Sequence, residues 1–208
     1  MPLQNRVDPF GAIHADPARG LFTGNRGVIH DPATRTLLSR RWTTRAWIVC
    51  TLEHPLGRKR QPMGRNAPSG GAGWTELFFL DEVTALAAGH RPCFYCRRAA
   101  AEDFRRCFAA GNGLGHASAP AMDALLHRQR LASGGTPPLL APGEAEALPD
   151  GAMIAIDGQA YAIRGAGALP WGFSRYGAAE PLPPGPVQLL TPRATVAALR
   201  AGYLPAWG

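Results

Sequence analysis

Two cysteines three positions apart, Cys93 and Cys96, stand in the segment GHRPCFYCRR. A Cys-x-x-Cys pair has two common uses in proteins outside secretory compartments, metal binding and redox chemistry. A redox pair is expected at the start of a helix that directly follows a strand. Here a helix-like segment and then Gly-His-Arg-Pro precede the pair. The pattern therefore favours a metal site.

A second pair of ligand residues lies upstream in CTLEH, where Cys50 and His54 are separated by three residues. Structural zinc sites combine two such short-spaced pairs, and thiolate with imidazole is a ligand set that suits zinc. The surrounding arginines favour the thiolate forms that bind metal. The sequence predicts a zinc ion bound by Cys50, His54, Cys93 and Cys96. His30 and His90 are reserve ligands, and Cys50 is otherwise a buried residue of a strand.

Positive charge is concentrated in one part of the chain. The 208 residues carry a formal net charge of +7. Residues 35–65 alone hold eight basic residues and one acid, Glu53. Because guanidinium groups bind phosphate in a bidentate manner, this pattern indicates nucleic acid, most simply DNA, as the partner. The expected phosphate contacts are Arg58, Lys59, Arg60, Arg97 and Arg98. A solvated basic surface, or one that binds an acidic protein, is the alternative.

Several segments have the composition of regular elements. We expect strands over 45–53, 74–80 and 187–191, and helices over 81–89, 97–111, 118–132 and 192–202. Asp157-Gly158 predicts a hairpin within 151–165. Residues 1–34 and the basic segment 55–73 are expected to be loops. The elements indicate an α+β fold with a zinc-knuckle domain over 1–135 and a β-rich C-terminal subdomain over 151–208, or one continuous domain.

The segment ELFFLDEVTALAAGHRPCFYCRR (76–98) resembles the second half of the zinc-binding domain of the Ada family of bacterial DNA-methylation repair proteins. More loosely, the resemblance extends over 45–98. It implies a zinc ion and a role in DNA repair or DNA processing. In Ada a zinc-bound cysteine accepts a methyl group from the DNA backbone. Cys50 is the residue of this chain that aligns with this methyl-accepting cysteine.

Two enzyme readings are alternatives. The segment RPCFYCRRAAAEDF also resembles the Pro-Cys-x-x-Cys and following helix of zinc-dependent deaminases, although the His- or Cys-x-Glu tripeptide of that family is absent. Asp123 and His127 lie four apart on the expected helix 118–132, where a carboxylate could orient an imidazole for acid–base work. Hydrolysis or deamination of nucleic acid or nucleotides is therefore the second hypothesis, with Cys50, Asp123 and His127 as candidate catalytic residues.

Hydropathy argues against a membrane protein. No apolar run approaches the roughly 20 residues that span a bilayer. The N-terminal residues lack the basic-then-apolar layout of a signal peptide. We expect a cytoplasmic protein whose four cysteines are not paired in disulfides.

Overall fold

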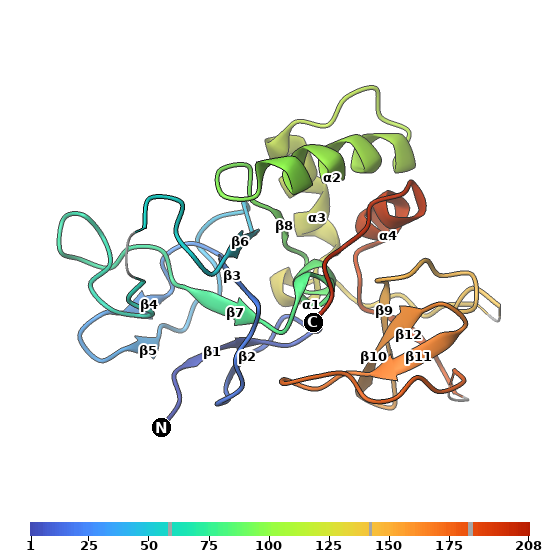
Figure 1. Cartoon of the computed structure of the whole chain (residues 1–208), viewed down its shortest axis with the longest axis horizontal. Coiled ribbons are helices and arrows are strands. Elements are labelled where there is room, and N and C mark those ends of the chain that lie inside the picture. Colours follow the sequence, from blue (N-terminus) through green and yellow to red (C-terminus); the bar gives the residue numbers. More distant parts are fainter. Residues whose placement is uncertain (58–59, 142, 183–184) are drawn as a thin grey trace.

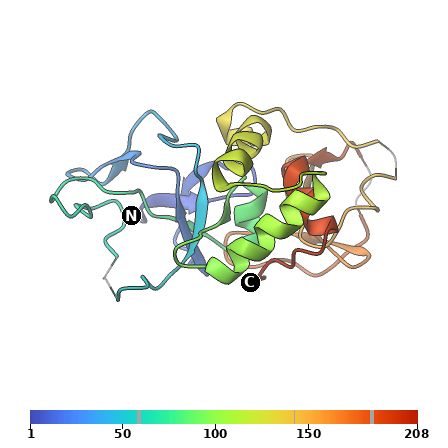
Figure 2. The same cartoon turned by 90° about the horizontal axis from the view of Figure 1, so that it is seen from above.

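The computed structural model describes residues 1–57, 60–141, 143–182 and 185–208. It has two main β-sheets, one toward each end of the molecule, with helices between them (Figures 1 and 2). This arrangement confirms the expected α+β class.

The N-terminal sheet has six short strands in the order β2-β1-β7-β3-β6-β8. Its strands are β1 (Gln4–Val7), β2 (Ile13–Ala15), β3 (Phe22–Asn25), β6 (Ile48–Thr51), β7 (Leu77–Phe79) and β8 (Arg91–Pro92). A separate hairpin joins β4 (His30–Asp31) to β5 (Thr36–Leu37). The expectation that residues 1–34 are loop is wrong. Strand β3 pairs with both β6 and β7. Partners far along the chain therefore stabilise strands in a segment whose many turn residues predict loop.

Two of the described helices begin at a side-chain cap. In α1 (Glu82–Ala87), the N-cap Asp81 accepts the Thr84 amide at 2.8 Å. In α3 (Ala119–Gln129), Ser118 accepts the Ala121 amide. Each cap satisfies an N–H that has no partner within its helix. The remaining helices are α2 (Arg98–Gly111), the 3-10 turn η1 (Leu131–Ser133) and α4 (Arg193–Arg200).

The C-terminal sheet has the order β11-β10-β9-β12. Its strands are β9 (Met153–Ile156), β10 (Gln159–Arg164), β11 (Gly167–Pro170) and β12 (Gln188–Leu189). The predicted hairpin at Asp157-Gly158 is present between β9 and β10. Both turn residues have positive φ, 49° and 80°, as a type I′ turn requires.

Buried side chains connect the two halves of the chain. Leu86 of α1 and Phe104 of α2 belong to the same apolar cluster as Ile154 of β9. Helices α2 and α4 approach so closely that a Cβ at Gly111 would lie 2.1 Å from the carbonyl oxygen of Ala197. The helices therefore share one core with the C-terminal sheet.

A buried Trp47 ties β6 to the helices. The guanidinium carbons of Arg26 and Arg130 lie 4.0 and 4.3 Å from the centre of its ring, and all three residues are at most 1% exposed. These two arginines also donate to the carbonyl oxygens of Gly11 and Arg45. Part of the arginine content thus belongs to the interior.

Among the described residues, no helix combines the length and the apolar character needed to cross a membrane.

Candidate metal centre

Three cysteine sulfurs converge at one edge of the N-terminal sheet. Cys50 lies on β6, and Cys93 directly follows β8, which runs parallel to β6. The Cys93 amide donates to the Val49 carbonyl at 3.0 Å, which holds the two strands in register. The chain then turns, with the Arg97 amide donating to the Cys93 carbonyl, and brings Cys96 back to the first two sulfurs.

The spacing of these sulfurs fits a metal ion. The ligand atoms of Cys50, Cys93 and Cys96 all lie within 4.8 Å of one another. Tetrahedral zinc with Zn–S bonds of about 2.3 Å holds its sulfurs about 3.8 Å apart, a separation that lies within this limit. The Tyr95 amide donates to the Cys93 sulfur at 3.4 Å, which orients it for ligation. The residues present therefore fit a thiophilic metal such as zinc.

The three thiols differ in acidity. The thiols of Cys50 and Cys96 donate to the Cys93 sulfur and hold its pKa well below the usual range. The hydrogen bonds of Cys50 with Cys93 and with Cys96, together with burial, raise the pKa of Cys50. For Cys96, the hydrogen bond with Cys50 lowers the pKa, but Cys93 and burial outweigh it and leave the pKa raised. At neutral pH the centre thus holds one thiolate, Cys93, and two thiols.

His54 lies near the sulfurs without joining them. It lines the same pocket as the three cysteines, and its ring centre is 6.3 Å from that of Tyr95. Its Nδ1 accepts the Leu56 amide at 3.1 Å, and its ring is outside the group of mutually close ligand atoms. The expected fourth ligand is therefore not in place. The reserve ligands are engaged elsewhere, since His30 bonds to Thr75 and His90 is buried against Phe79.

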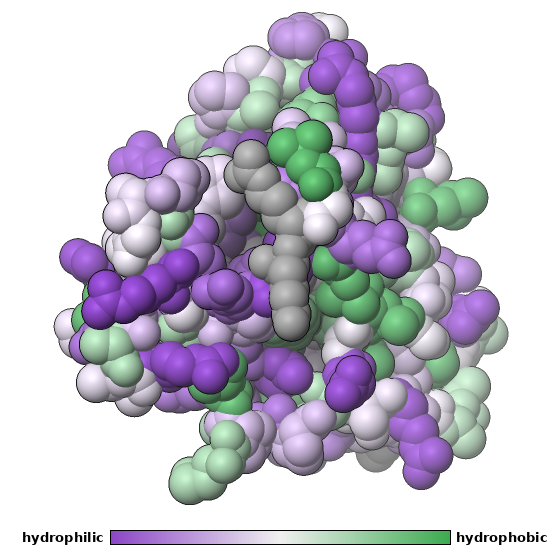
Figure 3. Space-filling view, turned by 60° about the vertical axis from the view of Figure 1, so that its left-hand side comes forward, coloured by the Kyte–Doolittle hydropathy of each residue, from purple (hydrophilic) through white to green (hydrophobic). Residues whose placement is uncertain are grey.

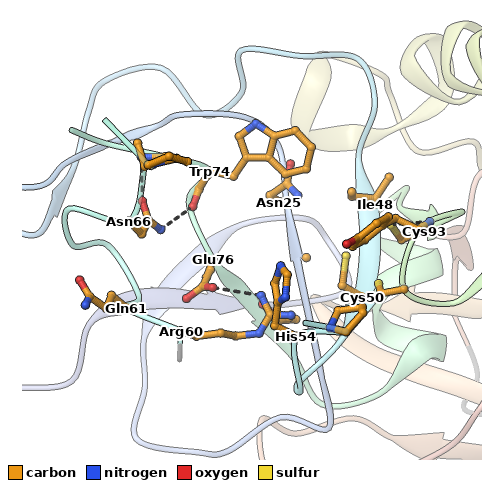
Figure 4. Close-up of a pocket in the computed structure, with 18 residues that line it drawn as sticks. Asn25, Ile48, Cys50, His54, Arg60, Gln61, Asn66, Trp74, Glu76 and Cys93 are labelled. Carbon is orange, nitrogen blue, oxygen red and sulfur yellow. Dashed lines mark hydrogen bonds and ion pairs between the residues drawn. The ribbon is translucent and has the colours of Figure 1, made fainter. Parts of the chain in front are cut away.

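The sulfurs face a pocket of about 560 Å³. Its other walls come from β3, from the segment 60–74 and from Glu76, which directly precedes β7 (Figure 4). Glu76 and Arg60 form an ion pair at 3.0 Å within it. Arg60 also donates to the carbonyl oxygens of Thr51 and Leu52. The guanidinium of Arg60, one of the predicted phosphate contacts, is therefore engaged in hydrogen bonds within the pocket wall.

The other predicted phosphate contacts differ in their environments. Arg97 is 10% exposed and donates to both carboxylate oxygens of Glu82 at 2.7 and 2.8 Å. This corrects the expectation for Arg97, because its guanidinium is engaged inside the fold. Arg98 is 76% exposed and remains able to contact a ligand. Arg58 and Lys59 lie outside the described residues.

Asp123 and His127 do not form the expected acid–base pair. Asp123 is buried, and both of its oxygens accept hydrogen bonds from Arg91 at 2.8 Å. His127 instead packs edge-on against Trp42, with ring centres 4.7 Å apart. A carboxylate bound on both oxygens by a guanidinium has no role in orienting the imidazole. The structure gives this pair a packing role.

Exposed arginines remain in the stretch 35–65 of the chain. They come from the loops around β5 and β6 and from the pocket wall, and they are Arg35, Arg40, Arg41, Arg45 and Arg65. None of these five forms an ion pair with a described carboxylate. Figure 3 shows many hydrophilic side chains, with apolar ones among them, on the face at the pocket end of the molecule. We call these five residues the arginine face.

Comparison with known proteins gives no match: no family model, no curated protein and no solved structure is similar to this chain.

Sequence reasoning missed Glu76, Asn25 and Trp74 as pocket residues. Trp74 and Glu76 lie within the predicted strand 74–80, and Asn25 lies in a segment expected to be loop. No spacing signal connects the three, because only the pairing of β3 with β7 brings them to one pocket.

Proposed function

We propose that this protein binds one zinc ion through Cys50, Cys93 and Cys96 and uses the centre in binding nucleic acid. The observation that carries the proposal is the convergence of three sulfurs within 4.8 Å at the wall of a pocket. Zinc bound there would tie β6 to the turn between β8 and α2, and this turn anchors the longest helix. A bound zinc ion adds its binding free energy to the folded state.

The arginine face supports nucleic acid as the partner. Five exposed guanidinium groups without a described carboxylate partner leave uncompensated positive charge in the stretch 35–65. Guanidinium groups with free donors bind phosphate oxygens in pairs. Phosphate contacts of this kind supply affinity that does not depend on base sequence. The arginine face replaces Arg60 and Arg97 as the proposed phosphate-binding surface.

A specific observation also favours the enzyme alternative, a zinc-dependent hydrolase or deaminase acting on nucleic acid or nucleotides. Only three described side chains converge on the metal position, and catalytic zinc sites characteristically have three protein ligands. Zinc in such a site supplies Lewis acidity. Glu76 lies in the same pocket and, as a carboxylate, can accept a proton. In this alternative the acid–base residue is Glu76, in place of Asp123 and His127.

Metal analysis tests the proposal directly. We expect elemental mass spectrometry to find one zinc per chain in the wild type and almost none in Cys50→Ser, Cys93→Ser and Cys96→Ser. His54→Ala should keep its zinc, because the His54 ring is outside the sulfur group. Cys107→Ser is the matched control, since this cysteine is buried in the core between α2 and its neighbours. A wild type without zinc would refute the metal centre.

Nucleic-acid binding needs its own measurement. We expect zinc-loaded protein to bind a short DNA oligonucleotide with an affinity that falls steeply as salt is raised. Substituting Arg35, Arg45 and Arg65 by glutamine should weaken binding without loss of zinc. Absence of binding at low salt would refute nucleic acid as the partner, and affinity that is independent of both salt and these arginines would refute the arginine face as the phosphate-binding surface.

A further inference from the structure

We infer that the pocket beside the three sulfurs binds a single unstacked nucleobase. This inference rests on the proposed function, and it names what the pocket itself receives while the arginine face holds the phosphates. It is carried by three kinds of group on the pocket wall: an acceptor without a partner, a donor without a partner, and an exposed aromatic ring.

The acceptor is Glu76. One of its carboxylate oxygens, Oε1, is paired with Arg60 at 3.0 Å. The other, Oε2, is shielded from solvent and has no hydrogen-bond partner among the described residues. Leaving a charged oxygen without a partner costs several times more than an ordinary hydrogen bond contributes. Rotation of the carboxylate would bring Oε2 to the pocket surface, where a ligand N–H that donates to it would remove this penalty and a phosphate or carboxylate would increase it.

The donor is Asn25. The residue is 6% exposed, and its Oδ1 accepts the Gly27 amide at 3.3 Å. Its Nδ2 makes no hydrogen bond to the described residues, although the side chain lines the pocket (Figure 4). The pocket therefore offers one acceptor and one donor. A nucleobase presents the complementary set, because N–H donors and ring or carbonyl acceptors alternate along its edge.

The aromatic ring is Trp74, which lines the pocket and is 62% exposed. Its backbone is fixed, since the side chain of Asn66 donates to the Trp74 carbonyl at 3.0 Å and accepts the Gly73 amide at 2.7 Å. Tyr95, beside the cysteines, lines the same pocket and is 64% exposed. Exposed rings on a fixed backbone provide stacking surfaces for an unpaired base. A volume of about 560 Å³ is ample for one base and its sugar.

Calorimetric titration of the zinc-loaded full chain tests the inference. The probes are the four deoxynucleoside 5′-monophosphates, with deoxyribose 5-phosphate and inorganic phosphate as probes that lack a base. We expect binding of nucleotides and at least tenfold weaker binding of both baseless probes. Equal affinity for deoxyribose 5-phosphate would overturn the inference, because the site would then be recognising phosphate alone.

Variants locate the bound base. Trp74→Ala should weaken nucleotide binding about 5- to 150-fold, the range that loss of one stacked aromatic produces, and Trp74→Phe should restore most of it. Glu76→Gln should weaken binding at least tenfold. Glu53→Gln is the matched control, since this exposed glutamate does not line the pocket. Unchanged affinity in both Trp74→Ala and Glu76→Gln would overturn the inference.

Zinc content distinguishes failure of the base pocket from failure of the metal centre. A wild type that holds zinc but binds none of the four nucleotides at millimolar concentration refutes the base pocket and leaves the metal centre standing. A chain without zinc refutes the proposed metal centre, and the same titration on that metal-free protein still decides whether the pocket binds a base. Zinc measured in every variant shows whether the fold around the sulfurs is intact.

Discussion

Replacing Arg97 by alanine tests whether this arginine stabilises the interior of the fold. Arg98→Ala, at the exposed neighbouring position, is the matched control. The two residues are neighbours at the start of α2. Arg97 is 10% exposed and donates two hydrogen bonds to Glu82, whose side chain is 1% exposed. Its guanidinium carbon also lies 4.5 Å from the centre of the Phe22 ring. Arg98 is 76% exposed, with only Glu102 at 3.8 Å.

The structure sets the size of the two effects. Removing one partner of a buried ion pair costs about 3–5 kcal/mol. Glu82 keeps two other donors, the Tyr203 hydroxyl at 2.6 Å and the Ala206 amide at 2.9 Å, so the lower end, about 3 kcal/mol, applies. For a chain of this length, that loss lowers Tm by about 6–12 °C. For Arg98→Ala the expected change is within about 0.5 kcal/mol.

Urea denaturation followed by circular dichroism, with zinc held at the same saturating level, measures both variants. DNA binding is measured at a temperature where each variant is folded, and there Arg97→Ala should bind as the wild type does. Similar stability losses in the two variants would refute the assignment of Arg97 to the interior. So would a loss of DNA affinity in Arg97→Ala without a loss of stability.

Three further predictions concern the buried pair, the thiols and the arginine face. Asp123→Ala should lower the free energy of unfolding by about 3–5 kcal/mol, because it leaves the Arg91 guanidinium buried without its carboxylate. His127→Ala should lower it much less. Urea denaturation measures both variants, and equal losses would contradict the prediction. Zinc binding at pH 7 should release about two protons, since Cys93 has a lowered pKa and is already a thiolate while Cys50 and Cys96 have raised pKa values and are thiols. Zinc affinity should therefore fall about 100-fold for each unit by which pH is lowered, and calorimetry in buffers of different ionisation enthalpy measures the protons; release of none would refute the protonation assignment. The double variant Arg45→Gln/Arg65→Gln should reduce the salt slope of binding to single-stranded DNA by about 1.4, or about 0.7 for each lost phosphate contact, and an unchanged slope would exclude the two residues from the interface.

Local signals in the sequence predicted much of the helical structure correctly. Asp81 and Ser118, residue types that favour the N-cap, stand at the first positions of the predicted helices 81–89 and 118–132, and both side chains cap the observed helices. The Asp157-Gly158 turn and the strands around it follow from residue types that favour positive φ and from alternation of apolar residues. Each of these features depends on residues within a few positions of one another, so the sequence alone contains the information.

The strands of the N-terminal sheet were harder to predict. Strands β1 and β3 are four residues each and lie among Gly and Pro residues, so their pairing with β7 supplies the stability that local propensity lacks. For the same reason the pocket residues Glu76 and Asn25 showed no pattern in the sequence, because they become neighbours only when β3 joins β7.

By itself, the sequence determined the α+β class, the starts of the capped helices and the presence of the Cys-x-x-Cys pair. Each of these depends on residue types at short spacing along the chain. The spacing of Cys50 and His54 also predicted Cys50 as a metal ligand. Only the tertiary structure decided that Cys50 joins Cys93 and Cys96 while the His54 ring stays apart, and that Arg97 faces inward. The physical reason is that charge and ligand type are properties of a residue, whereas burial and convergence depend on which distant strands pair.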